Sequence, residues 1–183
     1  SSFNATFYPA TTSGAVSPFI DASSFYPTAW HCIVAMIVGV VGEPITLGVN
    51  AINTVLLAVV FPLSMYDFFA VLFKDDRRAL LAGSAICVAF TASVWTFVSF
   101  GPLYPMLLSY SLVPSVASCF MELAGKETCK TDRIRYSIVV LIGLGAIALS
   151  QPSGIFTMGV LLAPYCVHRV YEVVREKYPS SDD

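Results

Sequence analysis

Long stretches without charge are the feature that most limits what this chain can fold into. Residues 79–99 contain no charged residue, and residues 45–73 contain only Asp67. A helix needs about 20 mostly apolar residues to cross about 30 Å of hydrocarbon. The chain is 56% apolar and 12% charged, with a mean hydropathy of +0.74, whereas soluble domains carry about a quarter charged residues. We therefore expect an integral membrane protein.

Five apolar stretches predict an all-α, polytopic transmembrane bundle with about five spans. A sixth stretch, residues 28–41, is short for a span and is typical of an interfacial or re-entrant helix. A full crossing there remains an alternative, and it would move the N-terminus to the other side. The five predicted spans are residues 45–73, 79–99, 103–121, 136–150 and 155–167.

All ten lysines and arginines fall in three segments, residues 74–78, 126–135 and 169–177. With five spans, these segments share one side of the membrane, and the positive-inside rule makes that side cytoplasmic. The uncharged turns around Gly101 and Gln151 then lie outside. We expect a multi-pass protein of the cell (plasma) membrane.

The same topology divides the chain into an extracytoplasmic loop (1–27), a transmembrane helical domain (28–178) and a polar tail (179–183). The first residue is Ser1 rather than methionine, and an exported N-terminus needs a preceding signal or span. We therefore expect the chain to be a piece of a longer protein.

Charge and cysteine content exclude several classes of protein. Lysine plus arginine (10) nearly balance aspartate plus glutamate (12), so no basic surface for nucleic acid is expected. The five cysteines show no C-x-x-C pair, which indicates neither a disulfide framework nor a zinc ligand set. The residues alone therefore predict no metal ligands.

Aromatic and polar side chains mark the predicted outer side. Tyr26, Trp30 and His31 stand where the loop leads into the short helix, and Tyr104 and Gln151 stand in proline-containing turns. Proline frees backbone carbonyls that must meet water, protein or a cavity. We interpret these five residues as candidate substrate-binding residues of an outward pocket. The alternative is an aromatic belt at the lipid headgroups with plain connecting turns.

Two carboxylates, Asp21 and Glu43, lie on the predicted outer side. A carboxylate there is what an extracytoplasmic enzyme uses as a base or a metal ligand. Solvated loop acids are the alternative for both. Asp21 is our candidate catalytic acid-base residue.

The polar residues inside the predicted spans favour structural roles. Asp67 lies near the inner end of its span and is expected to reach the interface. Glu122 precedes Lys126 by four residues, the order that favours a helical ion pair. Asn50 and Asn53 share a helix face, and we expect their amides to join helices by hydrogen bonds.

Three pieces in order, YPTAWH at 26–31, GPLYPMLL at 101–108 and QPSGIF at 151–156, resemble an uncharacterised family of bacterial polytopic membrane proteins. That family is similar to the GT-C superfamily of membrane glycosyltransferases, which use polyprenyl-phosphate-linked sugars. The resemblance implies transfer at the outer leaflet, with Asp21 at an acidic position of the outer loop. It also makes a divalent metal ion a candidate cofactor.

Two other classes of function compete with this one. A non-catalytic membrane scaffold or assembly subunit needs these polar groups only for packing. An ion-coupled transporter is disfavoured, because such proteins place ionisable groups near the midplane of their spans and no predicted span has one there.

Overall fold

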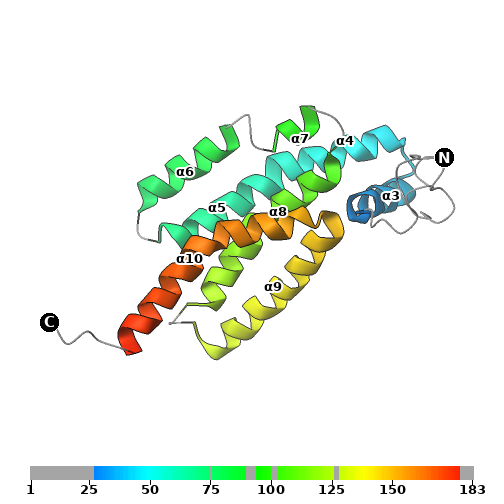
Figure 1. Ribbon diagram of the computed structural model, residues 1–183. Helices are drawn as coiled ribbons and strands as arrows, with labels where there is room; N and C mark the ends of the chain where they lie inside the picture. Colours follow the sequence, from blue (N-terminus) through cyan, green and yellow to red (C-terminus); the bar gives the residue numbers. More distant parts are fainter. Residues whose placement is uncertain (1–26, 75, 90–93, 100–102, 126–127, 178–183) are drawn as a thin grey trace.

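The computed structural model describes residues 27–74, 76–89, 94–99, 103–125 and 128–177. Within these ranges the protein is all-helical and contains no β-strand (Figure 1). This confirms the predicted all-α class. The helices are α3 (Ala29–Val41), α4 (Ile45–Val55), the π-helix η1 (Leu56–Val60), α5 (Phe61–Leu72), α6 (Arg77–Ala89), α7 (Thr96–Ser99), α8 (Tyr104–Leu123), α9 (Lys130–Ser150) and α10 (Ser153–Lys177).

Three helices of the described part are long and apolar enough to cross a membrane, rather than the five predicted. They are the continuous helix α4–η1–α5 (Ile45–Leu72), α8 and α9. The predicted span 79–99 is described as α6, of 13 residues, and the four-residue α7, with residues 90–93 outside the described ranges. The 25-residue α10 carries its charges in its second half, which lowers its overall apolar character.

Two predicted spans are parts of longer helices. The fourth predicted span, 136–150, lies within α9, which begins at Lys130, and the fifth, 155–167, lies within α10, which runs from Ser153 to Lys177. Lysine, arginine and glutamate are good helix formers, so a charged segment extends a helix that an apolar window cuts short. The short segment predicted at 28–41 forms the separate helix α3, as expected.

A proline shapes the first long helix. Pro62 stands in the first turn of α5, directly after the π-helical turn Leu56–Val60. Proline has no amide hydrogen, and its ring collides with the carbonyl four residues earlier in a regular α-helix. The wider π turn accommodates that collision, so the helix continues to Leu72 without a break.

Helix α8 is the centre of the bundle and packs against α5, α9 and α10. Over their most apolar 18 residues, 56% of α8 is buried, against 22% of α4–η1–α5 and 17% of α9. Two hydrophobic clusters flank it: one contains Trp30, Leu56 and Phe61, and the other Phe68 and Ile147. Helices α3, α5, α7, α9 and α10 therefore contact α8.

The outer faces of the surrounding helices are apolar. Phe156 is 77% exposed, Leu141 70% and Ile142 69%, and exposed valines and leucines continue along α9 and α10. Soluble monomers rarely expose contiguous apolar surface of this extent. Lipid tails are the solvent that suits such faces.

The bundle has two chemically different ends (Figure 1). The basic end is where α5 stops, α9 starts and α10 carries its charges; it holds Lys74, Lys130 and Arg169. The aromatic end is where α3 packs against the start of α8 and the end of α9; it holds Trp30 and Tyr104. The basic side chains Lys74, Lys130 and Arg169 thus lie at the other end of the bundle from the Trp30–Tyr104 pair.

Candidate functional site

The aromatic end brings together residues that are far apart in the sequence. The rings of Trp30, on α3, and Tyr104, at the start of α8, have centroids 4.8 Å apart and are tilted by 33°. The His31 ring meets Trp30 edge-on at 5.1 Å. Such offset and edge arrangements are the favoured geometries for aromatic pairs. Three of the five predicted binding residues therefore form one cluster.

Gln151 closes the same end of the bundle. It is the C-cap of α9, and its carbonyl accepts a hydrogen bond of 3.3 Å from the Ser109 hydroxyl of α8. Ser109 is five residues from Tyr104, about 7.5 Å along the helix. The Gln151 backbone thus lies beside the part of α8 that begins with Tyr104.

Trp30 is buried more deeply than a stacking platform for a ligand would be. Only 2% of its surface is exposed, and its ring is part of the hydrophobic cluster with Val34 and Leu107. Its indole nitrogen nevertheless has no hydrogen-bond partner, and the same holds for the Asn53 side-chain oxygen, among the described residues. An unpaired buried polar atom costs about 1–3 kcal/mol. Surface for a ligand is offered instead by His31 and Tyr104, which are partly exposed.

Burial also sets the charge of His31. Desolvation by burial lowers its pKa below 6.5, and a hydrogen bond with the Pro27 backbone partly offsets that shift. The imidazole is therefore neutral at pH 7, with one nitrogen as a donor and the other as an acceptor.

Two predicted site residues, Asp21 and Tyr26, lie outside the described residues. Both precede α3 in the chain, nine and four residues before Trp30. Glu43, the other predicted outer carboxylate, lies exposed between α3 and α4 and does not join the aromatic cluster.

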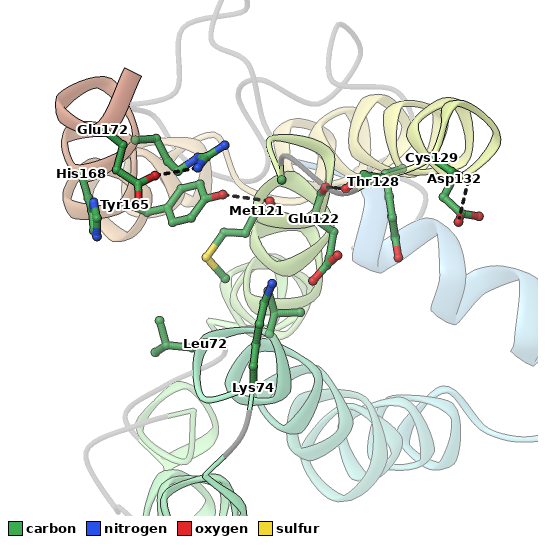
Figure 2. A pocket seen from close by; sticks show the side chains of 14 residues that line it. Leu72, Lys74, Met121, Glu122, Thr128, Cys129, Asp132, Tyr165, His168 and Glu172 are labelled. Carbon is green, nitrogen blue, oxygen red and sulfur yellow. Dashed lines mark hydrogen bonds and ion pairs between the residues drawn. The ribbon is translucent and has the colours of Figure 1, made fainter. Parts of the chain in front are cut away.

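The basic end holds a polar cavity that the sequence did not predict (Figure 2). The cavity has a volume of about 780 Å³, within the usual range for small-molecule sites. Its lining combines apolar side chains from α5 and α8 with charged ones from α8, α9, α10 and the segment that follows α5. The acidic and basic lining residues are Lys74, Glu122, Asp132, His168, Arg169 and Glu172.

Side chains from α10 tie the cavity wall to the end of α8. The Tyr165 hydroxyl donates to the Met121 carbonyl at 2.9 Å. The Arg169 guanidinium donates to the Ala124 carbonyl at 2.9 Å and pairs with Glu172 at 2.7 Å. The last carbonyls of a helix have no partner in the helix itself, and these contacts satisfy two of them. The sequence offered no signal for this, because the partners lie about 45 residues apart.

Two polar contacts join α5 to α8 between the two ends. The Ser115 amide donates to the Ser64 hydroxyl at 2.9 Å, and the Ser118 hydroxyl donates to the Asp67 carboxylate at 2.5 Å. Asp67 is exposed, and its carboxylate also links α5 to α8. For Asn50 and Asn53, the predicted helix-joining hydrogen bonds are not seen in the described part: Asn50 is exposed and the Asn53 oxygen is unpaired.

No group of three or more histidine, cysteine, aspartate or glutamate residues is placed to hold a metal ion in the described ranges. The carboxylates that line the cavity are partly committed elsewhere. Asp132 forms an ion pair with Arg135 at 3.3 Å and accepts a hydrogen bond from the Cys129 thiol at 3.1 Å. These residues do not fit a metal centre.

The described residues define a class: an all-helical protein with three helices suited to a membrane, an aromatic cluster at one end and a polar cavity at the other. Residues 2–181 match the family of unknown function DUF6541, and the chain belongs to that family. No curated protein and no solved structure matches the chain.

Proposed function

We propose that the chain is the membrane-embedded part of a GT-C-like glycosyltransferase that uses a polyprenyl-phosphate-linked sugar at the outer face of the membrane. One observation carries the proposal: the three sequence pieces of the resemblance meet at the aromatic end. Trp30 of the first packs on Tyr104 of the second, and Gln151 of the third is bonded to α8 through Ser109.

The proposal includes a topology in the plasma membrane. The three long helices cross it, and two further crossings are made by residues 79–99 and by the apolar first half of α10. The basic end then faces the cytoplasm, as the positive-inside rule favours, and the aromatic end faces out. Helix α3 lies at the outer interface.

In the proposed reaction, Asp21 is the general base. It takes the proton of an acceptor hydroxyl, whose oxygen attacks the anomeric carbon of the sugar. The bond from that carbon to the polyprenyl phosphate breaks, and polyprenyl phosphate leaves. His31, Tyr104, the Gln151 turn and Tyr26 orient the sugar, and the indole N–H of Trp30 is a donor without a described partner. The apolar helix faces hold the prenyl chain.

The test uses the full-length protein in lipid nanodiscs with a panel of polyprenyl-phosphate-linked sugars. The readout is the release of polyprenyl phosphate in the presence of acceptor. A general base contributes about 10²- to 10⁴-fold to the rate. We therefore expect Asp21→Asn to lower kcat at least about a hundredfold.

Two variants control this test. Glu43→Gln removes the other carboxylate near the aromatic end and is expected to keep the wild-type rate. His31→Gln is expected to raise KM with little change in kcat, because it removes a binding contact that the ground state and the transition state share. Wild-type transfer by Asp21→Asn would remove Asp21 from the mechanism.

The burial of Trp30 favours a second candidate, a non-catalytic scaffold or assembly subunit. A tryptophan with 2% exposure serves packing whether or not a substrate is present. If the protein is a scaffold, no donor in the panel gives sugar transfer. The Asp21→Asn variant then supports assembly as well as the wild type does. Co-purification of the full-length protein with its membrane partners, compared between wild type and Asp21→Asn, separates the two functions.

A further inference from the structure

The cavity at the basic end is lined by two opposite charges, Lys74 and Glu122, for which the described residues provide no ion-pair partner. Lys74 follows α5, and Glu122 lies in the last turn of α8. Both line the cavity, and Figure 2 shows the Lys74 amine directed towards the α8 wall that carries Glu122. Within the described residues, neither side chain makes an ion pair or a side-chain hydrogen bond; Lys126, the predicted partner of Glu122, lies outside them.

The other charged groups of the cavity are already used. Arg169 holds Glu172 and the end of α8, and Asp132 is paired with Arg135. The Thr128 hydroxyl donates to the Glu122 carbonyl at 2.6 Å, which fixes the turn that follows α8. The wall is therefore held in place by contacts that leave the Lys74 amine and the Glu122 carboxylate directed at the space.

The cavity is also amphipathic. Val71, Leu72 and Met121 contribute apolar surface, and they belong to the ends of two of the long apolar helices. Leu72 is 48% exposed. A site at the end of such helices lies at the depth of lipid headgroups, with hydrocarbon directly beside it.

From these observations we infer that the cavity binds the headgroup of a zwitterionic aminophospholipid. The phosphate lies against the Lys74 amine, the primary ammonium donates to the Glu122 carboxylate, and the acyl chains run along Leu72 and Met121. The chemistry recognised is a phosphate and an ammonium joined by a short linker. This site is at the opposite end from the proposed reaction and does not depend on it.

The test is native mass spectrometry of the full-length protein with defined phospholipids. The two lipids are phosphatidylethanolamine and phosphatidylglycerol, which share the phosphate but differ in the ammonium. One lost charge-assisted hydrogen bond corresponds to about a tenfold change in affinity or more. We expect wild-type protein to prefer phosphatidylethanolamine by about tenfold.

The variants separate the two halves of the headgroup. Lys74→Met is expected to weaken both lipids about tenfold, whereas Glu122→Gln is expected to weaken phosphatidylethanolamine alone and remove the preference. Lys130→Met and Glu43→Gln remove the same charges at exposed positions that do not line the cavity. They are expected to bind like the wild type.

Equal binding of the two lipids by wild-type protein would overturn the inference, and so would wild-type binding by Lys74→Met. Soluble phosphoethanolamine distinguishes the source of the ligand. If phosphoethanolamine displaces the lipid at equal concentration, the acyl chains contribute nothing to the affinity. The ligand is then a soluble compound, and the inference of a lipid is wrong. Retention of the lipid under that competition supports the membrane source.

Discussion

Gly154 shows how closely α8, α9 and α10 approach one another. A β-carbon at this position would collide with the Ser109 hydroxyl of α8 and lie 2.9 Å from the Ile147 side chain of α9. On the same helix, a β-carbon at Gly159 would have no neighbour within 4 Å. The helix crossing at α10 therefore requires glycine at one of these two positions and tolerates a side chain at the other.

We expect Gly154→Ala to lower the free energy of unfolding by about 1–3 kcal/mol, because the added methyl overpacks the crossing. The matched variant Gly159→Ala is expected to be neutral or stabilising by up to about 1 kcal/mol, the helix propensity difference. Thermal unfolding of the detergent-solubilised protein measures both. Equal stability of the two variants would show that the crossing is looser than described.

His31 makes the aromatic end sensitive to pH. Because burial lowers its pKa below 6.5, the folded protein binds fewer protons than the unfolded chain between the two pKa values. Stability is therefore full above about pH 6.5 and is lost as the pH falls towards the folded pKa.

We expect the melting temperature to fall between pH 7.5 and pH 5, and His31→Gln to remove part of that fall. His168→Gln, at an exposed position of α10, is the matched control and is expected to keep the wild-type slope. An unchanged slope in His31→Gln would contradict the assignment.

At the scale of elements, a proline in α8 is compensated by a neighbouring helix. Pro114 lies inside α8, and the amide of the next residue, Ser115, donates to the Ser64 hydroxyl of α5. Serine side chains on adjacent helices commonly satisfy backbone groups freed by proline in membrane proteins. Ser64 therefore joins two of the three long helices at their most irregular point.

Ser64→Ala is expected to lower stability by about 0.6–1.7 kcal/mol, the range for hydrogen bonds between helices in membranes. Ser84→Ala is the matched control, because among the described residues the Ser84 hydroxyl bonds the Leu80 carbonyl of its own helix. Its loss is expected to be smaller. Thermal unfolding in the same detergent compares them, and an equal loss would argue against a role for Ser64 in joining the helices.

A helix could be predicted from the sequence where its apolar segment extends over the whole helix. The segments at 45–73 and 103–121 correspond closely to Ile45–Leu72 and to α8. At α9 the predicted span covers only the apolar part of the helix, because its first turns contain Lys130, Asp132 and Arg133. Hydropathy marks the part of a helix that suits lipid, whereas backbone hydrogen bonding decides where the helix begins.

At the scale of the whole molecule, the two ends are predicted to face opposite compartments. Cys129, exposed at the basic end, and Glu43, exposed between α3 and α4, are suitable probes. In a full-length protein whose other cysteines are serine, we expect an impermeant thiol reagent to label Glu43→Cys in intact cells. Cys129 should be labelled only after the cells are permeabilised.

The same labelling after permeabilisation is the control, since both positions must then react. Labelling of Cys129 and Glu43→Cys to the same extent in intact cells would show that both ends face one compartment and would contradict the predicted topology. It would also remove the outward pocket on which the proposed glycosyl transfer rests.

The amino-acid sequence alone predicted the all-α class, the long apolar helices suited to a membrane and the confinement of all lysines and arginines to three segments, because these depend on composition and on spacing along one chain. Only the tertiary structure decided that Trp30 is buried against Tyr104, that α8 is central, and that Lys74 and Glu122 share a cavity. These properties depend on which helix faces meet, and the side chains involved come from helices tens of residues apart. A one-dimensional pattern does not contain that information, because burial and pairing arise only when the helices pack.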